Sequence, residues 1–186
     1  MQSALIFLVK TLADMYLLTF LLRFIMQWVR ASHHNPFSQF VFKVTSPLVV
    51  PARRVLPSIA GLDVPTLAVL LALEVLATFV LLLLSGFPVL VPELLLFSLL
   101  RLVSLTLWFY TIALFVYVLL SWFGARGMNP MADLLGEITE PLLRPARRML
   151  PPIGGLDLSP LIVILLLQAI MIVVVQWFPP HLSYLR

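Results

Sequence analysis

The chain has 186 residues, of which 62% are hydrophobic and only 11% are charged, and its net charge is +4. This composition leaves too little polar surface to cover a water-soluble globule, so it predicts a polytopic membrane protein. The sequence contains no cysteine, which excludes disulfides, thiol chemistry and thiolate metal sites.

Four apolar stretches are long enough to cross a bilayer, because a hydrocarbon core about 30 Å thick needs roughly 20 residues of helix. They are residues 4–29, 65–84, 94–123 and 160–178. Their runs of Leu, Val and Phe lack the alternation of apolar and polar residues that marks a membrane-spanning strand. The sequence therefore predicts an all-α membrane protein with four transmembrane helices.

The polar linker between the first two stretches returns 94 residues later. Asn35 and Asn129 are each followed by proline, and PARRVLP at 51–57 is repeated as PARRMLP at 145–151. The apolar stretches on either side have diverged, because lipid requires only apolar side chains. A fixed period of this kind predicts that the chain is a tandem repeat of one helical hairpin.

The repeat divides the chain into two domains, residues 1–92 and residues 93–186. Each should hold two transmembrane helices and one amphipathic, Pro-rich linker at the membrane interface, at 30–63 and at 124–158. Because each copy has an even number of spans, the two copies should be parallel, related by an axis along the membrane normal.

Basic residues are concentrated in the two linkers, and the connection at 85–93 has none. The linkers carry Arg30, Lys43, Arg53, Arg54, Arg126, Arg144, Arg147 and Arg148. The positive-inside rule therefore predicts that both linkers are cytoplasmic and that both termini lie outside. Lys10 and Arg101 are expected near the outer helix ends, where long side chains can reach the headgroups.

Six linker residues are expected to cap or end helices, and they are Asn35, Asn129, Asp63, Asp157, Pro47 and Pro141. Asn supplies an acceptor for an N-cap, and the proline after it lacks the N–H that would be unpaired in the first turn. The prolines at 47 and 141 disfavour helix at the residue before them, so a first amphipathic helix should end there and a second should follow. The aspartates precede the apolar runs as expected N-caps.

The linkers are expected to lie in the headgroup layer, with their apolar side toward the hydrocarbon core and their arginines toward the water. Arg53, Arg54, Arg147 and Arg148 are the candidate surface for anionic lipid or for an acidic partner. A topology signal without any partner is the alternative interpretation of the same arginines.

The linker residues resemble the YggT family, called YlmG in other lineages. The resemblance lies in PLVVPARRVLP at 47–57 and GLD at 61–63, and in a second copy that ends in GLDLSP at 155–160. It covers both copies, although the first copy has Asp63-Val64-Pro65 where the family pattern has Asp-x-Ser-Pro.

The resemblance implies a multi-pass protein of the bacterial inner (plasma) membrane with no catalytic or cofactor residue to carry over. Relatives have been linked to osmotic tolerance and potassium homeostasis, to division-gene neighbourhoods and, in organelles, to nucleoid placement and cytochrome assembly. The family therefore points to a membrane role that is not enzymatic.

Three of the polar residues inside the apolar stretches are candidates for a site, because an ionisable side chain at membrane depth costs at least about 2.5 kcal/mol and is a functional candidate by default. Asp14, Glu74 and Gln168 could line a proton or monovalent-cation site where the repeats meet. The alternative is a neutral Glu74 that is hydrogen-bonded to Gln168, with Asp14 satisfied by Lys10 one turn away. No basic residue is expected at the depth of Glu74.

The sequence has no phosphate-binding glycine loop, nucleophile elbow or zinc-protease motif, and its three histidines have no carboxylate cluster beside them. We therefore expect no enzyme, no cofactor, no metal and no direct contact with nucleic acid. The leading interpretation is a scaffold or accessory factor in envelope, osmotic or ion homeostasis. It would bind anionic lipid and associate with a second copy or another membrane protein. The alternative is a small oligomeric channel or transporter for protons or monovalent cations.

Overall fold

In the computed structural model, which describes residues 2–59, 61–88, 90–122, 129–149, 157–179 and 182, the chain forms six α-helices. They are α1 (Gln2–Trp28), α2 (Pro36–Val55), α3 (Val64–Leu84), α4 (Val91–Trp122), α5 (Pro130–Met149) and α6 (Ser159–Gln176). Four of these, α1, α3, α4 and α6, are long and apolar enough to cross a membrane. The predicted all-α fold with four transmembrane helices is confirmed, and the chain is a multi-pass membrane protein.

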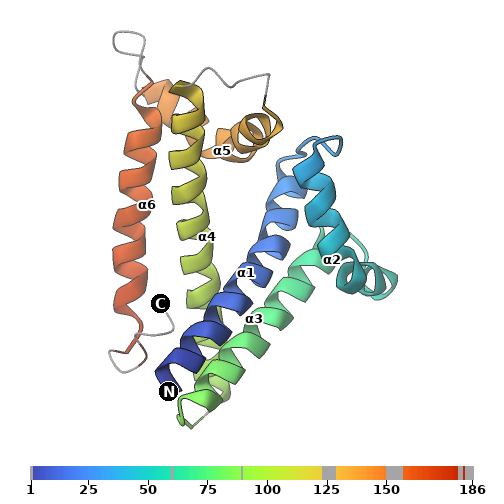
Figure 1. Ribbon diagram of the computed structural model, residues 1–186, viewed down its shortest axis with the longest axis vertical. Helices are drawn as coiled ribbons and strands as arrows, with labels where there is room; N and C mark the ends of the chain where they lie inside the picture. The colour runs from blue at the N-terminus through green and yellow to red at the C-terminus, as the bar shows by residue number, and fades with distance from the viewer. Residues whose placement is uncertain are drawn as a thin grey trace.

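The helices form two hairpins that point the same way (Figure 1). Helix α1 packs on α3 in the first repeat, α4 packs on α6 in the second, and α3 joins the repeats by packing on α4. Helices α2 and α5 lie at the same end of the molecule, where α1 and α4 end. The hairpins converge toward the opposite end, so the repeats are parallel, as the duplication predicts.

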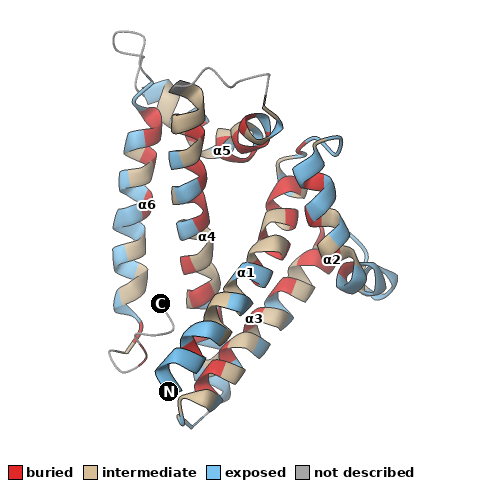
Figure 2. Ribbon diagram, viewed as in Figure 1, coloured by how far each residue is buried: buried red, intermediate tan, exposed pale blue. Residues whose placement is uncertain are grey.

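Buried side chains follow the inner sides of the spans, whereas the outer sides are exposed and apolar (Figure 2). The main cluster of buried apolar residues includes Leu17 and Phe20 of α1, Leu70 of α3, Leu114 of α4 and Leu167 of α6. This core therefore crosses from one repeat to the other. Because the spans are apolar all round, their outer sides suit contact with lipid rather than with water.

The expected break at Pro47 is wrong, because α2 continues through Pro47 and Pro51 to Val55. Helix α5 likewise contains Pro141 and Pro145. A proline removes one backbone hydrogen bond and crowds the preceding turn, which normally ends a helix. In α2 this cost is opposed by a buried stripe, Val41, Thr45 and Val49, that spans the proline at a spacing of four residues.

The asparagines begin both linker helices in the same way. The Asn35 side chain accepts a hydrogen bond from the N–H of Phe37, and the Asn129 side chain accepts one from the N–H of Met131. Each hydrogen bond joins the asparagine to the residue two positions later, which is the reach of an N-cap. Asp63 stands before α3 but makes no such bond to the helix backbone, so its expected role as a hydrogen-bonding cap is wrong.

Candidate functional site

Three charged side chains meet between the repeats within the membrane-spanning bundle. Arg101 of α4 places Nη2 2.6 Å from Asp14 Oδ1 of α1, and its Nε lies 3.2 Å from Glu74 Oε1 of α3. Arg101 and Glu74 are only 4% and 1% exposed. The acidic residues come from the first repeat and the arginine from the second, so this ion cluster is a contact between repeats.

Two sequence-based expectations about this region are wrong. Arg101 is not free to reach the headgroups, because it is only 4% exposed and its guanidinium pairs with Asp14 and Glu74. Glu74 does not pair with Gln168, which is exposed on α6 and donates a hydrogen bond to Thr111 at 3.3 Å. The charge of Glu74 is instead balanced by an arginine that was not expected at its depth.

Further contacts complete the ion cluster. Lys10 Nζ lies 3.6 Å from Asp14 Oδ2, and the Thr78 hydroxyl donates to Glu74 Oε1 at 3.4 Å. The two carboxylates are therefore balanced by two cations. Within the described residues, no group of three or more His, Asp or Glu side chains could hold a metal ion. The arrangement suits a contact that fixes the repeats against each other.

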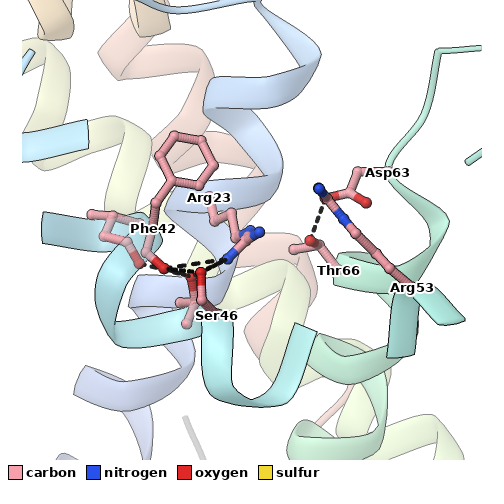
Figure 3. A network of polar contacts seen from close by, with 8 residues as sticks. Arg23, Phe42, Ser46, Arg53, Asp63 and Thr66 are labelled. Atoms are coloured by element: carbon pink, nitrogen blue, oxygen red, sulfur yellow. Dashed lines mark hydrogen bonds and ion pairs between the residues drawn. The ribbon is translucent and has the colours of Figure 1, made fainter. Parts of the chain in front are cut away.

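A second polar network surrounds Arg23, which is buried in α1. Its Nη1 donates to the Thr45 hydroxyl of α2 at 2.7 Å, and its guanidinium lies 5.0 Å from the centre of the Phe42 ring (Figure 3). In the second repeat the corresponding residues are Tyr117 and Gly136, which also pack together. Both pairs hold a linker helix against the end of the preceding span.

The first arginine of each Arg-Arg pair binds the aspartate before the next span. Arg53 Nη2 lies 3.0 Å from Asp63 Oδ2, where the Thr66 hydroxyl also donates (Figure 3), and Arg147 Nε lies 2.9 Å from Asp157 Oδ2. We call these two ion pairs the linker latches. They explain why the linker sequence is repeated, because each latch joins the end of a linker helix to the start of a span.

The latch in the second repeat also perturbs its carboxyl group. Partial burial raises the pKa of Asp157, but hydrogen bonds from Ser159 and the charge of Arg147 outweigh burial and hold that pKa below its usual value. Asp157 Oδ1 accepts from the N–H of Ser159, the first residue of α6, so this aspartate does contact the start of its helix.

The four candidate arginines of the lipid surface thus divide into two kinds. Arg53 and Arg147 are used inside the protein by the latches. Arg54 and Arg148 are exposed, and neither makes an ion pair with any residue in the part of the chain that the structure describes. Only this second pair keeps the geometry expected of a surface for lipid or a partner.

The two linkers also contact each other. The Asn35 amide donates to the carbonyl of Pro130, and the N–H of Ser32 donates to Glu137 at 2.9 Å. These bonds border a cavity of about 710 Å³ between the starts of α2 and α5. Arg126 and the linker residues 150–156, which the sequence analysis used, lie outside the described residues.

Sequence reasoning missed Arg101 and the latches, although signals for both were present. Asp14 and Glu74 are acidic and lie in the spans of one repeat, whereas the spans of the other contain the basic Arg101. Charge complementarity between repeats could have found that contact. The aspartate that ends each matched linker segment could have suggested a partner inside the same segment.

Comparisons with known proteins agree with this duplicated architecture. The CCB3/YggT family matches the chain twice, at residues 2–84 and 96–178. The chain is 40% identical over 178 residues to Uncharacterized protein PA0392 of Pseudomonas aeruginosa, which covers 95% of this chain and 90% of that protein. It is 38% identical over 169 residues to Uncharacterized protein YggT of Escherichia coli K12, covering 91% and 88% of the two chains.

A shorter match involves Uncharacterized protein ycf19 of Guillardia theta, which is 38% identical over 66 residues. That match covers 72% of the relative but 35% of this chain. No solved structure matches the chain.

Proposed function

Because the chain belongs to the CCB3/YggT family, which matches both of its repeats, we propose a non-catalytic scaffold or accessory role in the bacterial inner (plasma) membrane. The protein would serve envelope, osmotic or ion homeostasis by presenting its two linker helices to anionic lipid. A second copy or another membrane protein is the alternative partner for the same surface.

One observation carries this proposal: each linker helix ends in an arginine engaged in a latch, followed by an exposed arginine that is not. Arg54 and Arg148 occupy equivalent places in α2 and α5, which lie at the same end of the molecule. The apolar side chains that follow them, Val55 and Met149, are each 81% exposed. Basic and apolar groups side by side at a helix end suit the headgroup layer.

This role would place both linkers on the cytoplasmic side and both termini outside. The inner leaflet carries anionic lipid, which attracts a basic residue near its surface by about 1 kcal/mol. Because both linkers lie at one end of the bundle, the attractions of their basic residues to the same leaflet add together. The polar groups between the spans serve the fold in this proposal, because Asp14 and Glu74 are both engaged by Arg101.

The test compares two double variants of the purified protein with equal loss of charge. Arg54→Gln/Arg148→Gln removes the exposed arginines, and Arg53→Gln/Arg147→Gln removes those of the latches. After reconstitution with equal phosphatidylglycerol and phosphatidylcholine, native mass spectrometry counts the lipids that stay bound. We expect the first variant to lose its preference for phosphatidylglycerol and to keep its thermal stability.

The second variant should show the opposite pattern, with reduced thermal stability and a retained lipid preference. If both variants lose phosphatidylglycerol equally, net charge rather than this surface governs lipid binding. If neither loses it, the proposed surface does not bind anionic lipid, and association with a partner remains to be measured by cross-linking in membranes.

A second candidate function is a small oligomeric channel or transporter for protons or monovalent cations. The observation that favours it is the ion cluster itself, which places two carboxylates between the repeats within the bundle. Its test is flux in liposomes under K⁺, Na⁺ and H⁺ gradients, with oligomer mass measured in the same detergent. Glu74→Gln should abolish flux and Leu73→Ala should not, whereas equal behaviour of the two variants removes this candidate.

A further inference from the structure

One polar side chain in the middle of a membrane-spanning helix is exposed. Gln168 lies about 14 Å along α6 from Ser159, where the helix begins. Its amide nitrogen donates to the Thr111 hydroxyl at 3.3 Å, but its second N–H and its carbonyl oxygen bond to none of the described residues. Lipid tails offer neither donors nor acceptors, so these two groups are expected to bind a protein partner.

Helix α6 lacks a neighbour that its counterpart in the first repeat has. Helix α3 packs on α1 and also on α4, whereas among the described residues α6 packs closely on only one other span, α4. Three positions of α3 that are buried, at intervals of four residues, are exposed in α6. They are Glu74, Thr78 and Leu82, which correspond to Gln168, Ile172 and Gln176. The side of the first repeat that meets the second is therefore open in the second repeat itself.

The open side of α6 carries a stripe whose spacing suits the pairing of two helices. Its members follow at alternating intervals of four and three residues, and they are Leu161, Leu165, Gln168, Ile172 and Val175. We call this stripe the α6 seam. All of its members except the half-buried Val175 are exposed, on the outer side of the helix (Figure 2). The same alternation places the a and d residues of a coiled coil, in which one polar residue fixes the register.

A second copy of the chain can meet the α6 seam in two ways. If the contact between repeats continued from chain to chain, Phe7 of the next copy would occupy the place that Arg101 has within one chain. A phenyl ring gives the Gln168 amide no hydrogen bond. A two-fold contact of α6 with α6 instead brings Gln168 to Gln168, and an amide both donates and accepts. Copies of one sequence insert in the same direction, so the two amides lie at the same depth.

We propose that the chain forms a two-fold symmetric dimer in the membrane, in which α6 packs in parallel on α6 of a second copy along the α6 seam. At the centre of this contact the Gln168 amide of each copy donates to the carbonyl oxygen of the other. Leu165 and Ile172 pack on either side of the two amides. The dimer leaves the ion cluster inside each copy, and it is independent of the proposed lipid surface, which lies on α2 and α5.

Single cysteines test the geometry of the dimer, because the chain has none of its own. In membranes treated with copper phenanthroline, Leu165→Cys and Ile172→Cys should each form a disulfide-linked dimer of the full-length chain. Leu166→Cys and Val173→Cys are the matched controls, because each is exposed and lies one residue further along α6, on another side of the helix. We expect these two control variants to remain monomeric under the same treatment.

The mass of the purified protein, measured over a range of protein-to-detergent ratios, tests the hydrogen bond between the copies. Gln168→Leu should weaken dimerisation about three- to thirtyfold, as the loss of a hydrogen bond between membrane helices predicts. Thr111→Val removes the bond that Gln168 makes inside its own copy, and it should leave the dimer intact. Helix content and thermal stability measured alongside establish that both variants fold.

Three results would each overturn the proposal. The first is equal cross-linking of Leu165→Cys and Leu166→Cys, which would mean random collision in the membrane. The second is a dimer as tight in Gln168→Leu as in the wild type, which would leave the amide without a role. The third is a disulfide between Phe7→Cys in one tagged copy and Ile172→Cys in another that forms in preference to the Ile172→Cys dimer, which would establish the head-to-tail contact instead.

Discussion

The ion cluster between the repeats makes a specific prediction for Arg101→Met. This substitution keeps an unbranched side chain but removes the guanidinium that contacts Asp14 at 2.6 Å and Glu74 at 3.2 Å. Glu74 is only 1% exposed, so water cannot replace the lost partner. The variant should therefore carry an uncompensated carboxylate in the centre of the protein.

The expected cost follows from how the two carboxylates are placed. Removing one partner of a buried ion pair typically costs about 3–5 kcal/mol. Asp14 keeps Lys10 at 3.6 Å, whereas Glu74 keeps, among the residues that the structure describes, only the Thr78 hydroxyl at 3.4 Å. Most of the cost should therefore come from Glu74. Adding Glu74→Gln to Arg101→Met should recover about 2 kcal/mol, although Glu74→Gln alone is destabilising.

The assay is unfolding in mixed micelles, in which the fraction of denaturing detergent is raised while helix content is followed by circular dichroism. A double-mutant cycle of wild type, both single variants and the pair gives the coupling energy directly. Arg54→Met is the matched control, because Arg54 is exposed and pairs with none of the described residues. We expect its effect to be less than about 0.5 kcal/mol.

Two results would refute this reasoning. If Arg101→Met were no more destabilising than Arg54→Met, the ion cluster would not be buried as described. If the effects of Arg101→Met and Glu74→Gln simply added, the two side chains would not interact. A second readout is the distance between spin labels on α1 and α4, which can be introduced at single cysteines because the chain has none.

Two further predictions concern the second repeat. A Cβ at Gly136 would lie 3.4 Å from Tyr117 Cε2, which is an ordinary contact. Gly136→Ala should therefore be neutral or stabilise the protein by up to about 1 kcal/mol. Gly136→Leu should instead cost about 1–3 kcal/mol in the same unfolding assay. The pKa of Asp157 is lowered in the folded protein, so its latch with Arg147 stabilises the fold above about pH 4 and is lost as the pH falls through the lowered pKa. Asp157→Asn should lower the melting temperature at neutral pH, and this temperature should then fall less than that of the wild type below about pH 4. The same dependence of melting temperature on acid pH in both proteins would contradict the latch.

The architecture could be predicted because its signals are local and repeated. Four apolar stretches and the 94-residue period were sufficient for the spans, the two hairpins and their parallel relation. The asparagines before α2 and α5 also behaved as their type predicts, since an N-cap depends on residues within one turn.

The prolines misled because their local preference was overridden by packing. Pro47 lies inside α2, where buried residues on both sides of it contact the bundle along one continuous helix. Burial of a whole helix side outweighs a single lost backbone bond. Composition around the proline contains no information about what the opposite side of the helix will contact.

The ion cluster could not be predicted from depth alone. The expected stretch at 94–123 put Arg101 near its outer end, from which a long side chain could reach the headgroups, and nothing in that stretch shows that Asp14 and Glu74 hold the side chain inside the bundle. The pairing also depends on how α3 packs against α4, a long-range contact that periodicity does not encode. One of the two sequence-based interpretations therefore paired Glu74 with Gln168, the residue at the equivalent position, rather than with the residue of opposite charge.

That error shows what duplication within one chain permits. Where the repeats agree, as at Asp63 and Asp157, each copy makes the same contact within itself. Where they differ, the first copy supplies two acids and the second supplies Arg101, so the copies become partners. A symmetric dimer of one hairpin would present identical residues on both sides and would need acid and base together on each. Fusion into one chain removes that requirement, so the acids and the arginine of the ion cluster can each occur once.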